Sequence, residues 1–302
     1  MSEFSQNRMT PSVPTHSVAA SSEAGSLADA RETLLTIKPG RSAILRELKE
    51  AWEHRELLYF LIWRDLKVRY RQTVLGVAWV VLQPLLMTLV FTVFFSKLGH
   101  FRSDGVPYPI FAYAGLLPWT FFSNSISTGS SSLLANSYII TKVYFPRLLV
   151  PTAIVVVRLV DLLVASLVLI AILPFYGMGI GRSMLLLPVI IAEATILSLA
   201  VSYWLSVLSV RYRDVGTLLP VLIQLWMFAS PIIYPSSLVP DNWRRVYALN
   251  PLVGIIEGFR ASFLGLPFRW NAILVSAAIT LVFFINVLYA FYRWEDRVMD
   301  KL

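Results

Sequence analysis

The chain lacks cysteine altogether and carries little charge, and both shortages limit what it can be. With no cysteine among 302 residues, disulfides, thiolate nucleophiles and thiolate metal sites are excluded. The three histidines, His16, His54 and His100, are too dispersed for metal-ligand spacing. Only 15% of the residues are charged and 57% are hydrophobic, which is too apolar for an ordinary soluble fold and indicates a polytopic membrane protein.

Motifs for nucleotide binding and catalysis are also missing. The sequence contains no G-x-x-x-x-G-K-[ST] phosphate loop, no H-E-x-x-H helix and no G-x-S-x-G elbow. We therefore expect a chain that is not an enzyme and holds no cofactor of its own. The net charge of +8 is attributed to loop ends that face anionic lipid, so nucleic-acid binding is discounted.

The amino-terminal part divides into a tail and a basic helix. Residues 1–40 are rich in Ser, Ala, Thr and Pro, which predicts a disordered tail before a membrane domain over 41–302. The stretch 52–72 predicts an amphipathic interface helix in the membrane surface. Its apolar stripe consists of Tyr59, Ile62, Trp63, Leu66 and Tyr70. A topological anchor and a docking surface for a cytoplasmic partner both agree with this pattern.

The rest of the chain alternates apolar runs with short polar segments. We predict an all-α polytopic membrane protein with six transmembrane helices, at about 74–96, 108–128, 148–177, 184–210, 215–234 and 271–292. We predict a multi-pass protein of the cytoplasmic (inner) membrane with both termini in the cytoplasm. In this orientation most Lys and Arg residues lie in cytoplasmic segments, as the positive-inside rule requires. Four arginines in the last outside segment oppose this bias: Arg244, Arg245, Arg260 and Arg269.

The segment before the last span contains a further helical pattern, Asn250 to Gly265. It has an apolar stripe, with Glu257 and Arg260 on its polar side. It is too short to cross a bilayer, which needs about 20 residues. We expect a re-entrant or gate-like segment that packs over the mouth of the bundle, the alternative being a helix at the membrane interface.

Three charged residues lie inside predicted spans. A charge at the bilayer centre costs on the order of 3 kcal/mol, so each should have a partner. Arg158 and Asp161 are three residues apart on one helix and can neutralise each other, which we favour over a substrate or proton site. Glu193 has no local partner, so it is either protonated or paired with a hydroxyl or Arg of another helix.

Aromatic side chains are abundant in the first, second and fifth predicted spans. Together with nearby hydroxyls they suggest a ring-lined path for a carbohydrate, although an interfacial belt or helix packing would explain any single ring. The residues are Trp79, Tyr113, Trp119, Phe121, Phe122, Trp226 and Phe228.

Four motifs occur together in one order: Arg64 to Leu86, Ala114 to Ile126, Ser209 to Pro235 and Leu249 to Arg260. With them the chain resembles the membrane subunit (permease) of polysaccharide ABC exporters, which move lipid-linked O-antigen, capsule or teichoic-acid polymers. The resemblance implies a homodimer that binds two copies of a separate nucleotide-binding ATPase subunit, where ATP and Mg reside, and a lipid-linked polysaccharide as substrate. The long amino-terminal tail departs from the family's core pattern.

The resemblance also assigns roles to residues. Coupling to the ATPase falls to the loop from Tyr138 to Arg147 and to the interface helix, through Arg64, Lys67, Arg69, Tyr138, Ile140, Lys142, Tyr144 and Arg147. An outer gate is expected at Leu252, Ile256, Glu257, Phe259 and Arg260. The seven rings named above would guide the sugar chain.

Other functions remain open at this stage. A related exporter could carry a drug or a lipid instead of a polymer. An ion-coupled secondary transporter would show internal repeats and titratable midplane residues, and here only Asp161 and Glu193 are candidates. A membrane glycosyltransferase or ligase is disfavoured because no catalytic cluster is present.

Overall fold

The computed structural model describes residues 49–50, 52–71, 76–98, 103–142, 146–179 and 181–299. All of them belong to one compact unit, Gly40–Leu302. Throughout these residues the chain forms helices and turns, without a β-strand. The predicted tail, 1–40, lies outside the described residues.

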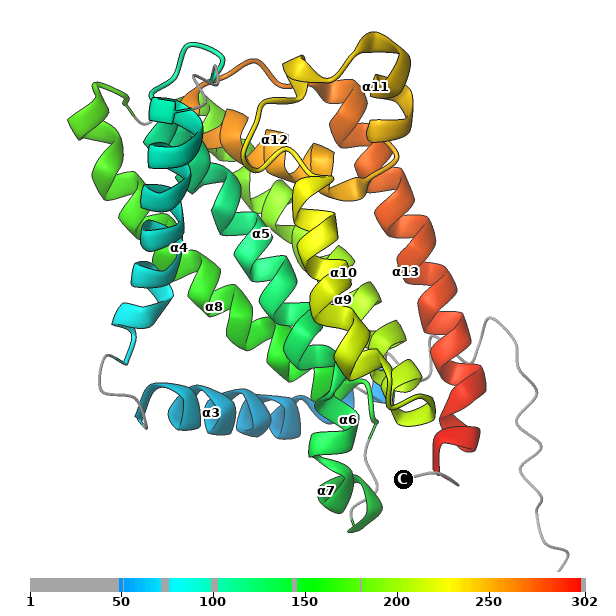
Figure 1. The fold of residues 1–302 in the computed structure, drawn as a ribbon. Helices are drawn as coiled ribbons and strands as arrows, with labels where there is room; N and C mark the ends of the chain where they lie inside the picture. The colour runs from blue at the N-terminus through cyan, green and yellow to red at the C-terminus, as the bar shows by residue number, and fades with distance from the viewer. Residues whose placement is uncertain are drawn as a thin grey trace, which may run out of the picture. The chain divides into compact units, whose positions relative to one another are not determined.

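The helices follow one another through short connections (Figure 1). In chain order they are α3 (Arg55–Arg71), α4 (Ala78–Phe91), the π-helix η1 (Thr92–Leu98), α5 (Tyr108–Ser130), α6 (Ser132–Ala135), α7 (Ser137–Lys142), α8 (Leu149–Ile172), η2 (Leu173–Tyr176), η3 (Arg182–Leu186), α9 (Leu187–Arg211), α10 (Val215–Phe228), η4 (Ser236–Leu238), α11 (Asp241–Tyr247), α12 (Pro251–Leu264) and α13 (Trp270–Met299).

Within the described part of the chain, 4 helical segments are long and apolar enough to cross a membrane: Ala78–Ser96, Leu149–Tyr176, Arg182–Arg211 and Trp270–Arg293. They overlap four of the six predicted spans. The other two predicted spans do not meet the same criteria, for different reasons. α5 has 23 residues but is rich in Ser, Thr, Asn and Gly, which lowers its hydropathy, whereas α10 ends after 14 residues.

α5 occupies the centre of the helix bundle and contacts α4, α8, α9, α10 and α12 (Figure 1). Most of its side chains are buried, including those on all sides of its first four turns. Its 23 residues make a helix about 35 Å long, at the 1.5 Å rise of an α-helix. A helix enclosed by other helices needs small and hydroxyl side chains for close packing more than a uniformly apolar surface, which explains its composition.

α3 lies crosswise at one end of the bundle, beside α6 and α7, whereas α11 and α12 lie at the opposite end (Figure 1). We refer to these as the α3 end and the α12 end. α3 packs against α8 and buries Leu61 in a hydrophobic cluster that also holds residues of α9 and α13, with Leu57 and Leu58 packed against this cluster. Of the predicted apolar stripe, Ile62 packs partly against the same cluster, whereas Tyr59 and Trp63 are exposed.

Two further segments differ from their predictions. The expected coupling loop from Tyr138 to Arg147 begins as a helix, because the segment after α5 forms two short helices, α6 and α7. α12 does pack on the bundle, against α5, α9 and α13. However, it has no solvated polar side at Arg260, whose side chain is almost fully buried. The reason is that backbone carbonyls of two other segments surround this arginine, as described below.

Candidate functional site

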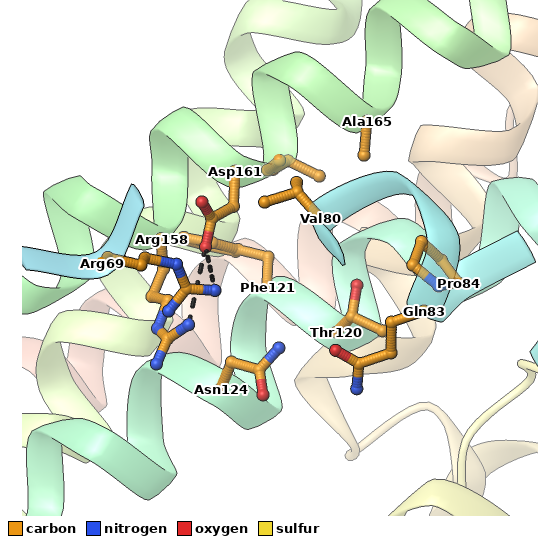
Figure 2. Close-up of a pocket in the computed structure, with 11 residues that line it drawn as sticks. Arg69, Val80, Gln83, Pro84, Thr120, Phe121, Asn124, Arg158, Asp161 and Ala165 are labelled. Carbon is orange, nitrogen blue, oxygen red and sulfur yellow. Dashed lines mark ion pairs between the residues drawn. The ribbon is translucent and has the colours of Figure 1, made fainter. Parts of the chain in front are cut away.

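A polar junction joins α3, α5 and α8 near the α3 end of the bundle (Figure 2). Its centre is Asp161 on α8, which lies 2.9 Å from Arg69 and 3.5 Å from Arg158 in two ion pairs. Asp161 also accepts a hydrogen bond of 2.5 Å from the Tyr70 hydroxyl. Arg158 in turn donates to Thr128 of α5 at 2.8 Å. One carboxylate thus connects the crosswise helix to two helices of the bundle.

A small cavity adjoins this junction. Its volume is about 30 Å³, enough for two or three water molecules at about 10–15 Å³ each. The polar side chains of Gln83, Thr120 and Asn124 line it together with the ion-paired residues. Burial, and then its bond to Asp161, raise the pKa of the Tyr70 hydroxyl above the ordinary value, so it stays a hydrogen-bond donor well above neutral pH.

The sequence predicted only part of this junction. Arg158 and Asp161 form the intrahelical pair that their spacing indicates. Arg69 and Tyr70 were missed as partners of Asp161, since they belong to another helix and approach α8 only when the chain is folded. A buried carboxylate with two arginines near it is the signal that could have pointed to them.

The segment of α6 and α7 presents a few side chains beyond the bundle at the α3 end. Tyr138 is 76% exposed, and Lys142 lies with its Nζ 5.8 Å from the centroid of the Tyr138 ring. Ile140 is buried and anchors α7 in the second hydrophobic cluster. Asn136 accepts a hydrogen bond of 3.1 Å from Arg64, which ties the segment to α3.

The remaining residues predicted for ATPase coupling have different environments. Lys67 is exposed, Arg69 belongs to the polar junction, and Arg147 is buried. Tyr144 lies outside the described residues. Of the coupling residues that the structure describes, Tyr138, Lys142 and Lys67 are exposed and accessible to a partner. The others make contacts within the chain or are buried: Arg64 binds Asn136, Arg69 binds Asp161, and Ile140 and Arg147 are buried.

The seven rings predicted to guide a sugar chain fall into two groups. Tyr113, Trp119, Phe121 and Phe122 are buried inside the bundle, and Trp226 is half-buried with its ring centroid 5.1 Å from that of Phe122. Trp79 and Phe228 are 48% and 53% exposed. The buried rings pack between helices of this chain, which leaves Trp79 and Phe228 as the rings with the most accessible faces.

Glu193 of α9 is buried and has a partner on another helix, as the lack of a local one suggested. The Ser276 hydroxyl of α13 donates to its carboxyl group, and the same hydroxyl lies 2.5 Å from the Pro251 carbonyl at the start of α12. One serine therefore joins α9, α12 and α13 at the α12 end.

Arg260 of α12 is the most elaborately bonded residue at the α12 end. It is 2% exposed. Its guanidinium donates to the carbonyl of Phe111 at 3.1 Å and to those of Pro231 and Ile232 at 2.5 Å each. Its Cζ lies 3.7 Å from the centroid of the Phe111 ring. Gly115 leaves the space for this group, because a Cβ at that position would collide with the guanidinium.

Electrostatics agree with this arrangement. Burial lowers the pKa of Arg260 to about 10, while Glu257 opposes the shift, so the guanidinium stays charged at neutral pH. Burial raises the pKa of Glu257, and Arg269 and Arg260 oppose that shift. Arg269 pairs with Glu257 at 3.6 Å. The other residues predicted for an outer gate, Leu252, Ile256 and Phe259, are buried in the main core.

No group of three or more His, Asp or Glu residues among the described residues could hold a metal ion. The polar side chains instead form isolated contacts between helices. Two of these have the most partners: the Asp161 junction at the α3 end and Arg260 at the α12 end.

Comparisons with known proteins agree on one family. The ABC-2 type transporter family matches residues 56–264. An O-antigen export system permease protein RfbA of Myxococcus xanthus is 33% identical over 222 residues, which cover 73% of this chain and 85% of that protein. A protein of the same name from Klebsiella pneumoniae is 31% identical over 69% of this chain and 80% of its own length. The polysialic acid transport protein KpsM of Escherichia coli is 24% identical over 65% of this chain and 77% of its own length.

Proposed function

The chain belongs to the ABC-2 type transporter family, and from this premise we propose that it is the membrane subunit of an ATP-driven exporter of a lipid-linked polysaccharide. The observation that carries the proposal is the similarity over most of both chains to a protein named as an O-antigen export permease. The polysialic acid transport protein supports the same class of cargo, a long sugar polymer. In this proposal the chain supplies the passage, and a separate subunit hydrolyses ATP.

We propose that six segments cross the membrane: the four long apolar helices, α5, and α10 with the turn that follows it. The length and central position of α5 support its assignment. The α3 end then faces the cytoplasm, because the basic residues of α3 and α7 gather there and positive charge is retained inside. α3 lies in the interface, where its exposed Tyr59, Phe60 and Trp63 meet lipid head groups.

Coupling is proposed to act through the segment of α6 and α7 and through α3. Two ATPase subunits would bind beneath a dimer of this chain, and Tyr138 and Lys142 are the accessible contact points. Movement of that segment reaches α3 through the bond between Asn136 and Arg64, and reaches α8 through Arg69 and Asp161. Binding of ATP thereby biases one of two arrangements of the helices, which is the general form of an energy-driven switch.

The proposed function is tested by deleting the gene for this chain and measuring polymer at the cell surface. Loss of the surface polysaccharide, its accumulation inside the cell and restoration by the wild-type gene are expected. Copurification of a nucleotide-hydrolysing subunit with the tagged chain is the second expected result. Unchanged surface polymer in the deletion strain would refute the assignment, and accumulation of a drug or lipid in its place would identify another cargo.

Replacing Tyr138 and Lys142 together by Asp should uncouple the ATPase from transport. Both side chains are exposed and neither belongs to the core, so the protein should fold and insert normally. The charge reversal should remove attraction to the partner and lower export while the two subunits hydrolyse ATP without productive transport. The matched control is Arg182→Asp, an exposed charge reversal at the α12 end. Normal export by the double variant would exclude α7 as the coupling segment.

Replacing Trp79 and Phe228 by Ala should slow export without lowering the amount of protein in the membrane. The two rings are accessible, so their removal opens no cavity in the core. If they contact the moving sugar chain, the double variant should export less polymer per molecule than either single variant. Phe175→Ala removes a still more exposed ring, at 87%, that was not predicted to line the path, and it should leave export unchanged. Equal export by all these variants would place the path elsewhere.

A further inference from the structure

Arginines at the α12 end are unexpected if that end lies outside, because positive charge is normally retained in the cytoplasm. The structure accounts for Arg260, which is used to bind backbone carbonyls inside the protein. Arg244 and Arg269 are exposed instead, and both line one cavity between α11, α12 and the start of α13. We therefore interpret these two residues as part of a ligand-binding site and not only as exceptions to the positive-inside rule.

The cavity has the size of a ligand site. Its volume is about 610 Å³, within the range of about 300–1,000 Å³ that small-molecule sites occupy. A second cavity of about 230 Å³ adjoins it and shares Ser236, Glu257 and Arg269 with it. The two together form a recess that reaches from the surface of α13 toward the buried Arg260.

The polar groups in this recess include an unused acceptor. One carboxylate oxygen of Glu257 lies 3.6 Å from Arg269 and accepts a hydrogen bond from Ser236. The other oxygen has almost no accessible surface and no hydrogen-bond partner among the described residues. A buried carboxylate oxygen without a donor is costly. Glu257 lines both cavities, so a rotation of its carboxyl group toward them would bring this oxygen to a ligand hydroxyl, which is a donor that satisfies it.

The charged groups of the recess are mostly occupied by the protein itself. Arg244, Arg260 and Arg269 line it together with Glu257 and Asp104, which leaves one positive charge in excess. Arg260 already donates to three backbone carbonyls, and Arg269 pairs with Glu257. Donors and acceptors of both kinds therefore line the recess, which suits a ligand with many hydroxyl groups.

Aromatic rings line part of the cavity. Phe268 and Trp270 lie with their ring centroids 5.4 Å apart at an angle of 32°, and Tyr247 lines the same cavity. Trp270 is 52% exposed, so its face remains accessible. Rings of this kind offer flat apolar surfaces beside polar groups, which is the combination that the two faces of a sugar ring require.

We propose that this recess is a saccharide-binding site at the outer end of the protein, where one sugar unit stacks on Trp270 and donates a hydroxyl to Glu257. The proposal rests on the proposed function, which supplies the sugar chain and the outward orientation of the α12 end. It goes beyond that function by placing a contact for the polymer away from the helices that would form the passage. A polymer held there after crossing would be hindered from slipping back.

The absence of cysteine from the sequence allows a direct test. Asn271→Cys places a single thiol in the wall of the cavity, and Gly179→Cys places one in an exposed turn of the same end but outside it. The purified full chain in lipid nanodiscs is labelled with a maleimide, with or without short oligosaccharides cut from the cell's own surface polysaccharide. The oligosaccharide should slow labelling at position 271 several-fold and leave labelling at position 179 unchanged.

Variants and competing ligands complete the test. Trp270→Ala should abolish the protection, and because Trp270 is exposed this change should not affect folding. Glu257→Gln, which keeps the shape of the side chain, should weaken the protection of the thiol at position 271 by the oligosaccharide. No protection by the oligosaccharide overturns the proposal, and so does equal protection of both thiols. Protection by inorganic phosphate or by phosphatidylglycerol nanodiscs in place of the sugar also overturns it, and indicates a lipid head-group site.

The two proposals fail in different ways. If deletion of the gene abolishes surface polymer but the oligosaccharide protects nothing, only the saccharide site is refuted. If deletion leaves surface polymer unchanged, the exporter assignment fails and the saccharide site falls with it.

Discussion

Arg260→Met should prevent the protein from accumulating in a folded form. The substitution leaves the carbonyls of Phe111, Pro231 and Ile232 without their donor inside the protein. A buried carbonyl without a partner costs about 1–3 kcal/mol, whereas removing the buried charge returns part of that loss. The net decrease in the free energy of unfolding should be on the order of 3–5 kcal/mol, a large share of the roughly 5–15 kcal/mol that keeps a typical protein folded.

The measurements are the amount of protein in the membrane and its thermal unfolding in detergent. Arg269→Met is the matched control, because this arginine is exposed and its ion pair with Glu257 contributes about 1 kcal/mol or less. Gly115→Ala tests the same contact from the opposite side, since its methyl group would occupy the position of the guanidinium. If Arg260→Met unfolds at the wild-type temperature, the three hydrogen bonds do not hold the α12 end together.

Asp161→Asn should destabilise the α3 end nearly as strongly. It leaves two arginines, Arg69 and Arg158, close together without a countercharge in a partly buried junction. Removing one partner of a buried ion pair costs about 3–5 kcal/mol, and the 33% exposure of the Arg69 side chain should bring this toward the lower value. Export should fall further than the amount of folded protein, because α3 also loses its hold on α8.

Two further variants separate the effect of charge from that of shape. Asp214→Asn removes an exposed carboxylate at the same end and should have little effect. Replacing both Arg158 and Asp161 by Leu removes the more deeply buried pair together, and it should recover part of the stability that Asp161→Asn loses. Thermal unfolding that is the same for Asp161→Asn and the wild type would show that the junction carries no stabilising interaction.

The sequence predicted the long helices well because hydropathy is a local property. The runs that became α4, α8, α9 and α13 could be located from composition alone. α3 lies within the helix predicted at 52–72. Which of its side chains would meet the bundle was not indicated by hydropathy, because that depends on the neighbouring helices, and Leu61 is the residue buried there.

The polar contacts were harder to predict, because their partners are far apart in the sequence. Arg158 and Asp161 could be paired from their spacing, but Arg69 could be added only from the fold. The same applies to Arg260, which an amphipathic pattern places on a wet face. Backbone carbonyls carry no sequence signal, so nothing in the sequence indicated that Phe111 and Pro231 would receive its hydrogen bonds.

The hydrogen bonds of Arg260 have a mechanical consequence. They fasten α12 to the first turn of α5 and to the turn after α10, so these three segments behave as one rigid body. If the outer end opens to release cargo, this body has to swing as a whole, since sliding α12 alone would break three bonds at once. The pivot then belongs at its margins, and Gly265, whose φ of +66° only glycine adopts without strain, is the natural place for it.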